Sequence, residues 1–428
     1  MNLQLELHND RDSLRSLDKG LKTIIQEKGL LTVGGKNVSF CGLVVSNDVI
    51  HAFLPRETNI NIDKLDQKIQ LASEMMAAIH RYSTTKNNEI YADDEGNDFF
   101  GLNKLSAIIW LLNDFRVNGL FYKRKQRRVV NSGKPDWKKT ISNRTAFVTD
   151  SGPIYLDIDG TSSYRFVGEE ITRIHADVIR KLDKEFSWLI STKKSQISAS
   201  LKSINPPSGK VEFQLSHLKS QRHAHFATRD LELISHLIDF LEQIRGKDKQ
   251  YFVMGLKHFH GMWENMLAET LNWTVKLNHL LAIPSYKLND GTVVDVAKKG
   301  QRTDIVLRRP GTDSFAVADA KYYGVTKGTN NAPGWTDLVK QFFYAKALTT
   351  YRSSAQVTNA FIFPGKEGPI LSAHMKNRQT GIFEDSEYTP IKCIYICPRL
   401  LIQHYIKGKK LASLSERLLS AGPSQGFN

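Results

Sequence analysis

The chain contains little cysteine. Cys41, Cys393 and Cys397 are its only three cysteines among 428 residues. Three thiols do not make the even, regular disulfide framework of a small secreted protein, and no histidine joins them at the spacing of a zinc site. We interpret all three as packing residues, and a reducing compartment fits this composition.

The sequence also lacks a long hydrophobic run. No stretch approaches the roughly 20 apolar residues that a membrane-spanning helix requires. The first residues, Met1 to His8, contain no cationic segment followed by an apolar core. The sequence therefore predicts a soluble protein of the bacterial cytoplasm, without a membrane partner.

The sequence has fewer acidic than basic residues. The 59 Lys and Arg outnumber the 44 Asp and Glu, which gives a formal net charge of +15. This sign favours a polyanionic partner such as nucleic acid. The alternative is a soluble protein that is merely basic, so the charge supports a nucleic-acid partner without proving one.

The length of the chain predicts two or three structural units. We expect an N-terminal region of mixed α+β structure over residues 1–245, with a further break possible near 150–165. We expect an α/β domain over residues 246–428, with a mixed central sheet flanked by helices, because the apolar runs 359–364 and 391–396 alternate with helical segments. The polar segment 246–250 is the predicted boundary.

Local patterns place further elements. Two β-rich runs, 38–45 and 49–55, flank a Ser-Asn-Asp turn and predict a hairpin. We interpret His51 within it as a packing residue. The acidic segment 91–98 lacks the ligand spacing of an EF-hand and is predicted to be a solvated loop. Apolar residues at helical spacing predict helices over the following segments: 65–79, 105–118, 169–190, 231–244, 259–271, 335–348 and 400–406.

A basic segment with interleaved aromatic residues follows the helix predicted over 105–118. It could contact DNA phosphates, although a solvated loop explains the same composition equally well. Phosphate contacts carry no base information, so the segment does not indicate a recognition sequence. The candidate DNA-binding residues are Lys123, Arg124, Lys125, Arg127, Arg128, Trp137, Lys138 and Lys139.

Two acids and a lysine dominate the C-terminal half. Asp304 begins one apolar run and Asp319 ends the next, and the turn-rich residues 308–314 between them predict a hairpin that brings these acids together. Residues two apart on a strand share a face, so Lys321 should point the same way as Asp319. Two carboxylates suit Mg²⁺, and the lysine could orient or deprotonate a water or offset charge on a phosphate. Taken alone, the triplet favours a surface salt bridge at the strand ends, and the surrounding order of helix, hairpin and helix is what supports a metal site.

Two further residues are candidates for the same site. Glu264 lies on the helix predicted upstream of the hairpin and could supply a supporting or second metal carboxylate. Glu269 on the same helix is the alternative, and either could be a surface acid. Gln341, on the helix predicted downstream, could help to place the water or the strand.

This order of helix, hairpin and helix resembles the core of PD-(D/E)xK nucleases, with Thr303 where that motif has proline. Three segments together resemble the LlaJI-type restriction endonucleases, which look like relatives of the McrC subunits of McrBC systems. These segments are the hairpin from Gly42 to Pro55, Gly133 to Ile141, and Phe259 to Met266.

The resemblance implies a site-specific, Mg²⁺-dependent (or Mn²⁺-dependent) endonuclease of double-stranded DNA, whose C-terminal domain cuts and whose N-terminal region contacts DNA or a partner. Asp304, Asp319 and Lys321 match the metal and catalytic positions of the family, and Glu264 matches its helical acid. Gln341 resembles a downstream glutamine of RecB-like nucleases, but Tyr344 lies one residue short of their Gln-x-x-x-Tyr spacing.

The resemblance also implies partners. The sequence has no Gly-x-x-x-x-Gly-Lys-Ser/Thr loop, so an McrB-like NTPase would have to be a separate chain. A cognate DNA methyltransferase and a homodimer with two active sites are further expectations. The alternative function is a non-catalytic DNA-binding or assembly subunit that works with a separate NTPase chain.

Overall fold

The computed structural model describes residues 4–46, 49–88, 99–166, 169–186, 188, 199–244, 251–296, 302–325 and 328–420. The chain forms two compact units, one of residues 1–102 with 249–428 and one of residues 103–248. The sequence prediction divided the chain differently, at 245/246. The segments predicted as a boundary, 246–250, and as an acidic loop, 91–98, lie outside the described residues.

The first unit contains two sheets. The N-terminal sheet has the strand order β1-β3-β2-β10-β4. The predicted hairpin is confirmed, because β2 and β3 pair antiparallel. β1 lies parallel to β3 at one edge, and β10 joins β2 from far along the sequence. The strands are β1 (Gln4–Asn9), β2 (Cys41–Ser46), β3 (Val49–Leu54), β4 (Phe99–Phe100) and β10 (Tyr251–Leu256).

Two glycines allow β10 to join this sheet closely. Gly42 on β2 and Gly255 on β10 face each other in register, and the ring of Phe40 covers both. A Cβ at Gly42 would lie 2.9 Å from the Phe40 ring, and one at Gly255 would lie 2.6 Å from it. Backbone carbonyl oxygens of the opposite strand would be closer still, at 2.2 Å for Gly42 and 2.3 Å for Gly255, so a side chain here would force the two strands apart.

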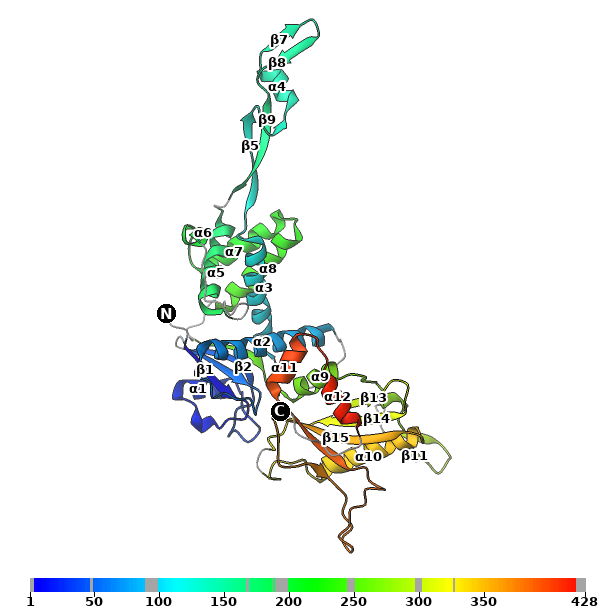
Figure 1. The fold of residues 1–428 in the computed structure, drawn as a ribbon. Helices are drawn as coiled ribbons and strands as arrows, with labels where there is room; N and C mark the ends of the chain where they lie inside the picture. The colour runs from blue at the N-terminus through cyan, green and yellow to red at the C-terminus, as the bar shows by residue number, and fades with distance from the viewer. Residues whose placement is uncertain are drawn as a thin grey trace. The chain divides into compact units, whose positions relative to one another are not determined.

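Helices cover both faces of the N-terminal sheet (Figure 1). On one face, α1 (Lys19–Glu27) buries Leu21, Ile24 and Ile25 in a cluster with Phe40, Val44 and Phe53. The longer α2 (Leu65–Asn88) runs along the other face and also contacts helices of the second sheet. α2 therefore joins the two sheets into one unit.

The second sheet has the order β13-β14-β15-β17-β16. β13 and β14 form the predicted antiparallel hairpin, and β14, β15 and β17 are parallel neighbours. The sheet is thus mixed, as predicted from its apolar strands. Its strands are β13 (Ile305–Arg308), β14 (Ser314–Ala320), β15 (Gln356–Pro364), β16 (Ser372–Ala373) and β17 (Ile391–Ile396).

Helices lie on both sides of this sheet as well (Figure 1). α10 connects β14 to the parallel β15 and packs on one face through Phe342, Ala345 and Leu348. α9 and α12 pack on the opposite side, and α11 follows β17. Three of these helices were predicted from the sequence. The helices are α9 (His260–Thr270), α10 (Trp335–Tyr351), α11 (Pro398–Ile406) and α12 (Ala412–Leu419). A short hairpin of β11 (Ser285–Lys287) and β12 (Val293–Asp295) precedes the sheet.

The second unit has a helical part. His175 of α5 is fully buried, and its Nδ1 accepts a hydrogen bond from the backbone N–H of Phe121 at 3.1 Å. Burial lowers the pKa of His175 to about 3, so this histidine is a neutral packing residue.

The helices of the second unit are α3 (Leu102–Asn118), α5 (Glu170–Phe186), α6 (Ala199–Lys202), α7 (Val211–Gln221) and α8 (Thr228–Ile244).

The basic segment of this unit is a strand and not a loop. β5 pairs antiparallel with β9 over eight residues to form a ribbon, which leaves the helical part where Lys123 faces Phe166. α4 and the small hairpin β7–β8 lie at the other end of the ribbon. The sequence prediction of a possible break near 150–165 falls within this unit. The elements are β5 (Lys123–Val130), β6 (Lys134–Pro135), α4 (Trp137–Asn143), β7 (Ala146–Thr149), β8 (Gly152–Tyr155) and β9 (Asp159–Phe166).

No helix within the described ranges is both long and apolar enough to cross a membrane.

Candidate active site

A cleft of about 480 Å³ opens where β13 begins and β14 ends. Four of the predicted site residues line it, namely Glu264, Asp304, Asp319 and Lys321. They come from α9, from the residue before β13, from β14 and from the residue just after β14. The structure thus brings together in one cleft four side chains that span almost 60 residues of sequence.

Asp304 and Asp319 are in direct contact. Asp304 precedes β13 and Asp319 lies near the end of β14, so the hairpin register sets them opposite each other. Their carboxyl groups share a hydrogen bond, and Asp304 Oδ2 also accepts the backbone N–H of Ala320 at 3.0 Å. Two carboxyl groups can share a hydrogen bond only if one of them holds a proton.

Burial raises the pKa of Asp304 to about 8, and the hydrogen bond to Asp319 and the negative charges of Asp319 and Glu264 act in the same direction. Burial, followed by the charge of Asp319, also raises the pKa of Glu264. When all three acids are ionised, they repel one another in a partly desolvated space. A cation placed among them would remove this repulsion.

Lys321 lies between two carboxylates. Its Nζ is 2.9 Å from Asp319 Oδ2 and 2.9 Å from Asp337 Oδ1. Burial acts to lower the pKa of Lys321, but these two acids outweigh it and leave the pKa raised. Lys321 is thus an ammonium in this arrangement. It is suited to offsetting charge and orienting water, and poorly suited to the proton abstraction that the sequence reading also allowed.

Asp337 was missed by the sequence analysis. It lies in the first turn of α10, and its Oδ2 accepts a hydrogen bond from the hydroxyl of Tyr323 at 3.3 Å. Nothing in its local sequence distinguishes it from any acid placed near a helix N-terminus. Its partner Lys321 is 16 residues away, and only the packing of α10 on the sheet brings the two together.

The structure decides between the two glutamates of α9. Glu264 lines the cleft, whereas Glu269 points elsewhere and pairs with Arg81 of α2 at 2.9 Å. Glu264 is therefore the acid that can act with Asp304 and Asp319.

Gln341 is placed differently from the other predicted residues. It does not line the cleft and is almost fully buried. Its Nε2 donates to the carbonyl oxygens of Val317 and Ala360 and to Asn359 Oδ1, at distances of 2.6 to 3.3 Å. Because Val317 is on β14 and the other two are on β15, Gln341 holds these strands together. Of the two roles considered from the sequence, only the placing of a strand fits this geometry. Tyr344, one turn further along α10, does line the cleft.

The donor set suits a hard divalent cation. Mg²⁺ commonly binds one or two protein carboxylates and fills its remaining positions with water and substrate phosphate. Asp304 and Asp319 supply such a pair. In the part of the chain that the structure describes, no three acids of this cleft bring their oxygens within 4.8 Å of one another, so Glu264 stands farther off than the pair.

Basic residues surround the acids. Arg11, Arg302 and Lys340 line the same cleft, and Arg11 belongs to the segment after β1 of the N-terminal sheet. The N-terminal sheet also supports the chain beside Lys321, because the backbone N–H of Arg56 donates to the hydroxyl of Tyr322 at 2.9 Å. Neither Arg11 nor Arg56 was among the site residues predicted from the sequence.

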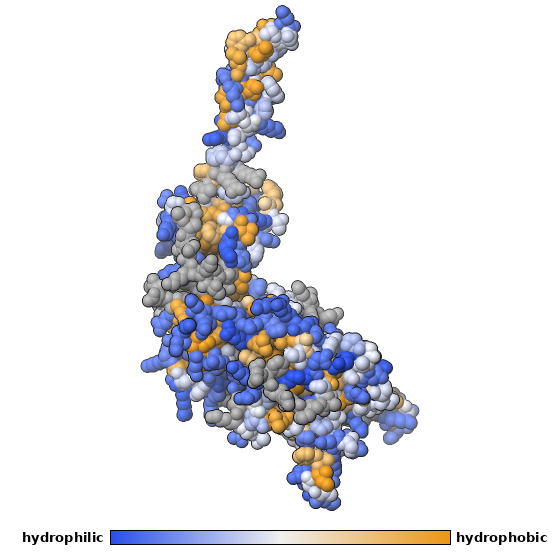
Figure 2. Space-filling view, in the orientation of Figure 1, coloured by the Kyte–Doolittle hydropathy of each residue, from blue (hydrophilic) through white to orange (hydrophobic). Residues whose placement is uncertain are grey.

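The predicted DNA-binding residues all lie in the second unit. Lys123, Arg127 and Arg128 are exposed on β5, where Arg124 also lies, and Trp137 and Lys138 are exposed on α4. Lys125 lies 3.6 Å from the ring centre of Phe166 and 3.5 Å from Glu169 Oε1, and Lys139 pairs with Asp136. Hydrophobic side chains also gather at the end of the ribbon that carries α4 and β7–β8 (Figure 2).

The protein has a mixed α/β fold, and its cleft contains two paired carboxylates and a lysine at the ends of neighbouring strands. The chain belongs to the LlaJI restriction endonuclease family, whose model matches residues 40–373. The match covers the cleft acids and the lysine, and it confirms the resemblance found in the sequence.

A curated relative is the type II restriction enzyme BsuMI component YdjA of Bacillus subtilis (strain 168). It is 22% identical over 419 residues, which are 92% of this chain and 86% of the relative.

Two solved structures are also similar. In an assembly of Thermococcus gammatolerans McrB AAA+ hexamers with bound McrC, the matched chain is 12% identical with a TM-score of 0.39, over 95% of this chain and 99% of that one. A cryo-EM structure of the McrBC complex of the same organism gives 11% identity and a TM-score of 0.28, over 61% of this chain and 85% of that one.

Proposed function

We propose that the chain is a divalent-metal-dependent endonuclease that hydrolyses phosphodiester bonds of double-stranded DNA in a restriction system. The observation that carries the proposal is the Asp304–Asp319 pair with Lys321 beside it in an open cleft. Membership of a restriction endonuclease family supports it. We assign the order α9, β13–β14 hairpin and α10, with these side chains on it, to a PD-(D/E)xK core.

Asp304 and Asp319 would hold Mg²⁺ or Mn²⁺, and Glu264 would support the pair. Bound there, the ion would polarise a phosphoryl oxygen and make an attacking water more acidic. Lys321, kept charged by Asp319 and Asp337, would offset the negative charge that develops on the phosphate. Arg11, Arg302 and Lys340 would hold the neighbouring phosphates of the strand.

The basic residues of β5 and α4 would add contacts to the DNA backbone. Such contacts depend strongly on salt and carry no base information. We therefore assign them to affinity and not to the choice of sequence.

A partner chain is part of the proposal. The relative from Bacillus subtilis is named a component of a restriction enzyme, and the present sequence contains no P-loop. An NTPase subunit and a cognate methyltransferase would then be separate proteins. A non-catalytic assembly subunit is the competing function, and the same relative's name is compatible with it. The complete set of acids and lysine in the cleft favours the nuclease.

The test compares cleavage of unmethylated and methylated plasmid DNA in Mg²⁺, with and without the products of neighbouring genes. Lys321→Ala should lower the cleavage rate by about 10²- to 10³-fold, as expected for one group that stabilises transition-state charge. Lys346→Ala is the matched control, because Lys346 is an exposed lysine of α10 that does not line the cleft. Wild-type cleavage by the Lys321→Ala chain would refute the assignment, and a wild-type chain inactive in every combination would favour the assembly subunit.

A further inference from the structure

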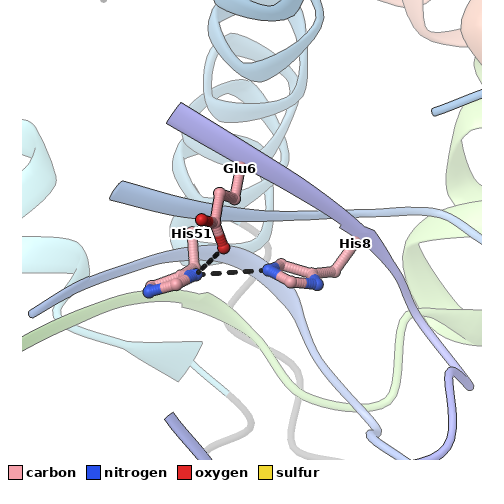
Figure 3. A group of neighbouring side chains, drawn as sticks. All are labelled: Glu6, His8 and His51. Atoms are coloured by element: carbon pink, nitrogen blue, oxygen red, sulfur yellow. Dashed lines mark hydrogen bonds and ion pairs between the residues drawn. The ribbon is translucent and has the colours of Figure 1, made fainter. Parts of the chain in front are cut away.

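Glu6, His8 and His51 form a cluster away from the acidic cleft (Figure 3). Among the residues that the structure describes, they are the only three of the His, Cys, Asp and Glu type whose potential ligand atoms all lie within 4.8 Å of one another. Glu6 on β1 is the register partner of His51 on β3. His8 lies two residues beyond Glu6 and therefore projects from the same face of the strand.

Two of the three distances match those between ligands of one metal ion, and the third, between Glu6 and His8, is within 4.8 Å. His8 Nε2 lies 3.2 Å from His51 Nδ1, and Glu6 Oε2 lies 3.4 Å from the same nitrogen. In a tetrahedral zinc site with bonds of about 2.0–2.1 Å, neighbouring ligand atoms are roughly 3.3–3.5 Å apart. No large rearrangement is needed for the three side chains to bind one ion.

Hydrogen bonding alone does not satisfy this cluster. His51 Nδ1 makes both contacts, but a neutral ring nitrogen carries either one proton or one lone pair. If it donates to Glu6, it cannot accept from His8, and if it accepts from His8, it faces the Glu6 oxygen with a lone pair. A cation at the centre would satisfy all three groups together.

The surroundings favour neutral imidazoles and a positive ion. Burial lowers the pKa of both His8 and His51, and for His8 the neighbouring His51 adds to this effect. Neutral imidazole is the form that binds metals. The ring of His8 stacks on Phe53 with 4.9 Å between ring centres, which fixes its orientation. Asp18, the N-cap of α1, adds negative charge near both histidines.

We propose that Glu6, His8 and His51 bind a divalent transition-metal cation, Zn²⁺ by their ligand types, which ties the edge strand β1 to β3. Imidazole and carboxylate ligands select such an ion, whereas the oxygen-only acids of the cleft suit Mg²⁺. Three protein ligands leave a fourth position for water or another donor. This proposal does not depend on the function of the cleft.

The test uses the full-length chain, stripped of metal and titrated with ZnCl₂ in excess Mg²⁺, so that the carboxylates of the cleft are competed for. We expect about one equivalent of Zn²⁺ to bind and to raise the melting temperature, because a ligand that binds only the folded state stabilises it. Co²⁺ in place of Zn²⁺ should give the intense visible absorption of a four-coordinate site. A wild-type chain that shows neither binding nor stabilisation would overturn the proposal.

Two substitutions localise the ion. His8→Gln and Glu6→Gln should each weaken Zn²⁺ binding by more than about 100-fold, because even residues that only support a ligand cost 10- to 100-fold. His223→Gln, at an exposed histidine outside the cluster, should bind like the wild type. Should His8→Gln fail to fold, Glu6→Gln decides, since the Glu6 side chain is 45% exposed. Unchanged Zn²⁺ affinity in a folded variant would place the ion elsewhere and overturn the assignment.

Discussion

The two sheets of the first unit each carry a cluster of ionisable side chains on neighbouring strands, and the two clusters are opposite in chemistry. Where β13 begins and β14 ends, burial and mutual repulsion raise the pKa of Asp304 and of Glu264, which reaches the acid pair from α9. On β1 and β3, burial lowers the pKa of His8 and His51. In both places burial favours the neutral form. In the cleft the neutral form is a protonated acid, and in the N-terminal sheet it is an unprotonated imidazole.

The two clusters also differ in how they meet solvent. The acids lie at strand ends, beside a cleft of about 480 Å³ with basic residues around it. The histidines lie within the strands, on a sheet face that also carries the buried Phe53. A strand end can admit a large substrate, whereas the interior of a sheet face can hold only a small one. Under the two proposals, the cleft is the place for chemistry and the histidine cluster is the place for structural support.

The largest expected effect concerns the proton held by Asp304. Its folded-state pKa of about 8 lies above the ordinary value of 3.8, so between these pH values the folded state binds a proton that the unfolded state has lost. Stability is then lost as pH rises through this window. The melting temperature of the metal-free wild type should fall by several degrees between pH 5 and pH 9, and Asp304→Asn should remove this fall.

Repeating the melting-temperature measurement with Mg²⁺ tests whether the ion and the proton compete for the same acids. Because the ion competes with the proton, saturating Mg²⁺ should restore stability most strongly near pH 8 to 9. A metal-free wild type and an Asp304→Asn variant with the same pH dependence would show that the acids of the cleft are not coupled as described.

Separate substitutions of the two glutamates of α9 test which acids belong to the acidic cluster. Glu264→Gln should lower the cleavage rate by about 10- to 100-fold, because the group supports the acid pair without joining it. Glu269→Gln removes the same charge from the same helix but only breaks the pair with Arg81, so it should cut DNA at the wild-type rate. Equal losses in the two variants would mean that helix stability, and not the cleft, accounts for the effect.

The smallest expected effect is the pH dependence of stability that the histidine cluster causes. Its sign is opposite to that of the Asp304 effect. The imidazoles of the cluster have folded-state pKa values below the ordinary 6.5, so below pH 6.5 the unfolded state binds more protons. Stability is then lost as pH falls. His51→Gln should flatten the decline in melting temperature of the metal-free chain between pH 6.5 and pH 5 while leaving the change above pH 7 intact. If His51→Gln leaves this decline in melting temperature unaltered, other groups cause it.

Much of the cleft was predictable, because its elements are local in sequence. The hairpin follows from two apolar runs across a turn-rich connection, and alternation along a strand puts Lys321 on the side of Asp319. Asp337 and Arg11 were not predictable, since each reaches the cleft from an element whose place is set by packing. Gln341 illustrates the same difficulty, because the sequence offered two roles and only the neighbouring strands distinguish them.

The N-terminal sheet was harder to predict for a related reason. β1 joins β3 from the start of the sequence and β10 joins β2 from about 200 residues further along, and no local pattern records a pairing between residues 251–256 and 41–46. His51 was expected to be a packing residue, and it is buried, but its partners Glu6 and His8 come from the parallel edge strand.

The sequence by itself determined the basic charge, the scarcity of cysteine, the hairpin that carries the acids and the lysine, and the resemblance to a restriction endonuclease family. These depend on residue types and short spacings, which fix local geometry. The tertiary structure decided which glutamate of α9 faces the acids, what holds Lys321 as an ammonium, and that two histidines and a glutamate converge on β1 and β3. Those results depend on contacts between segments far apart in the chain, where packing and burial set both position and charge.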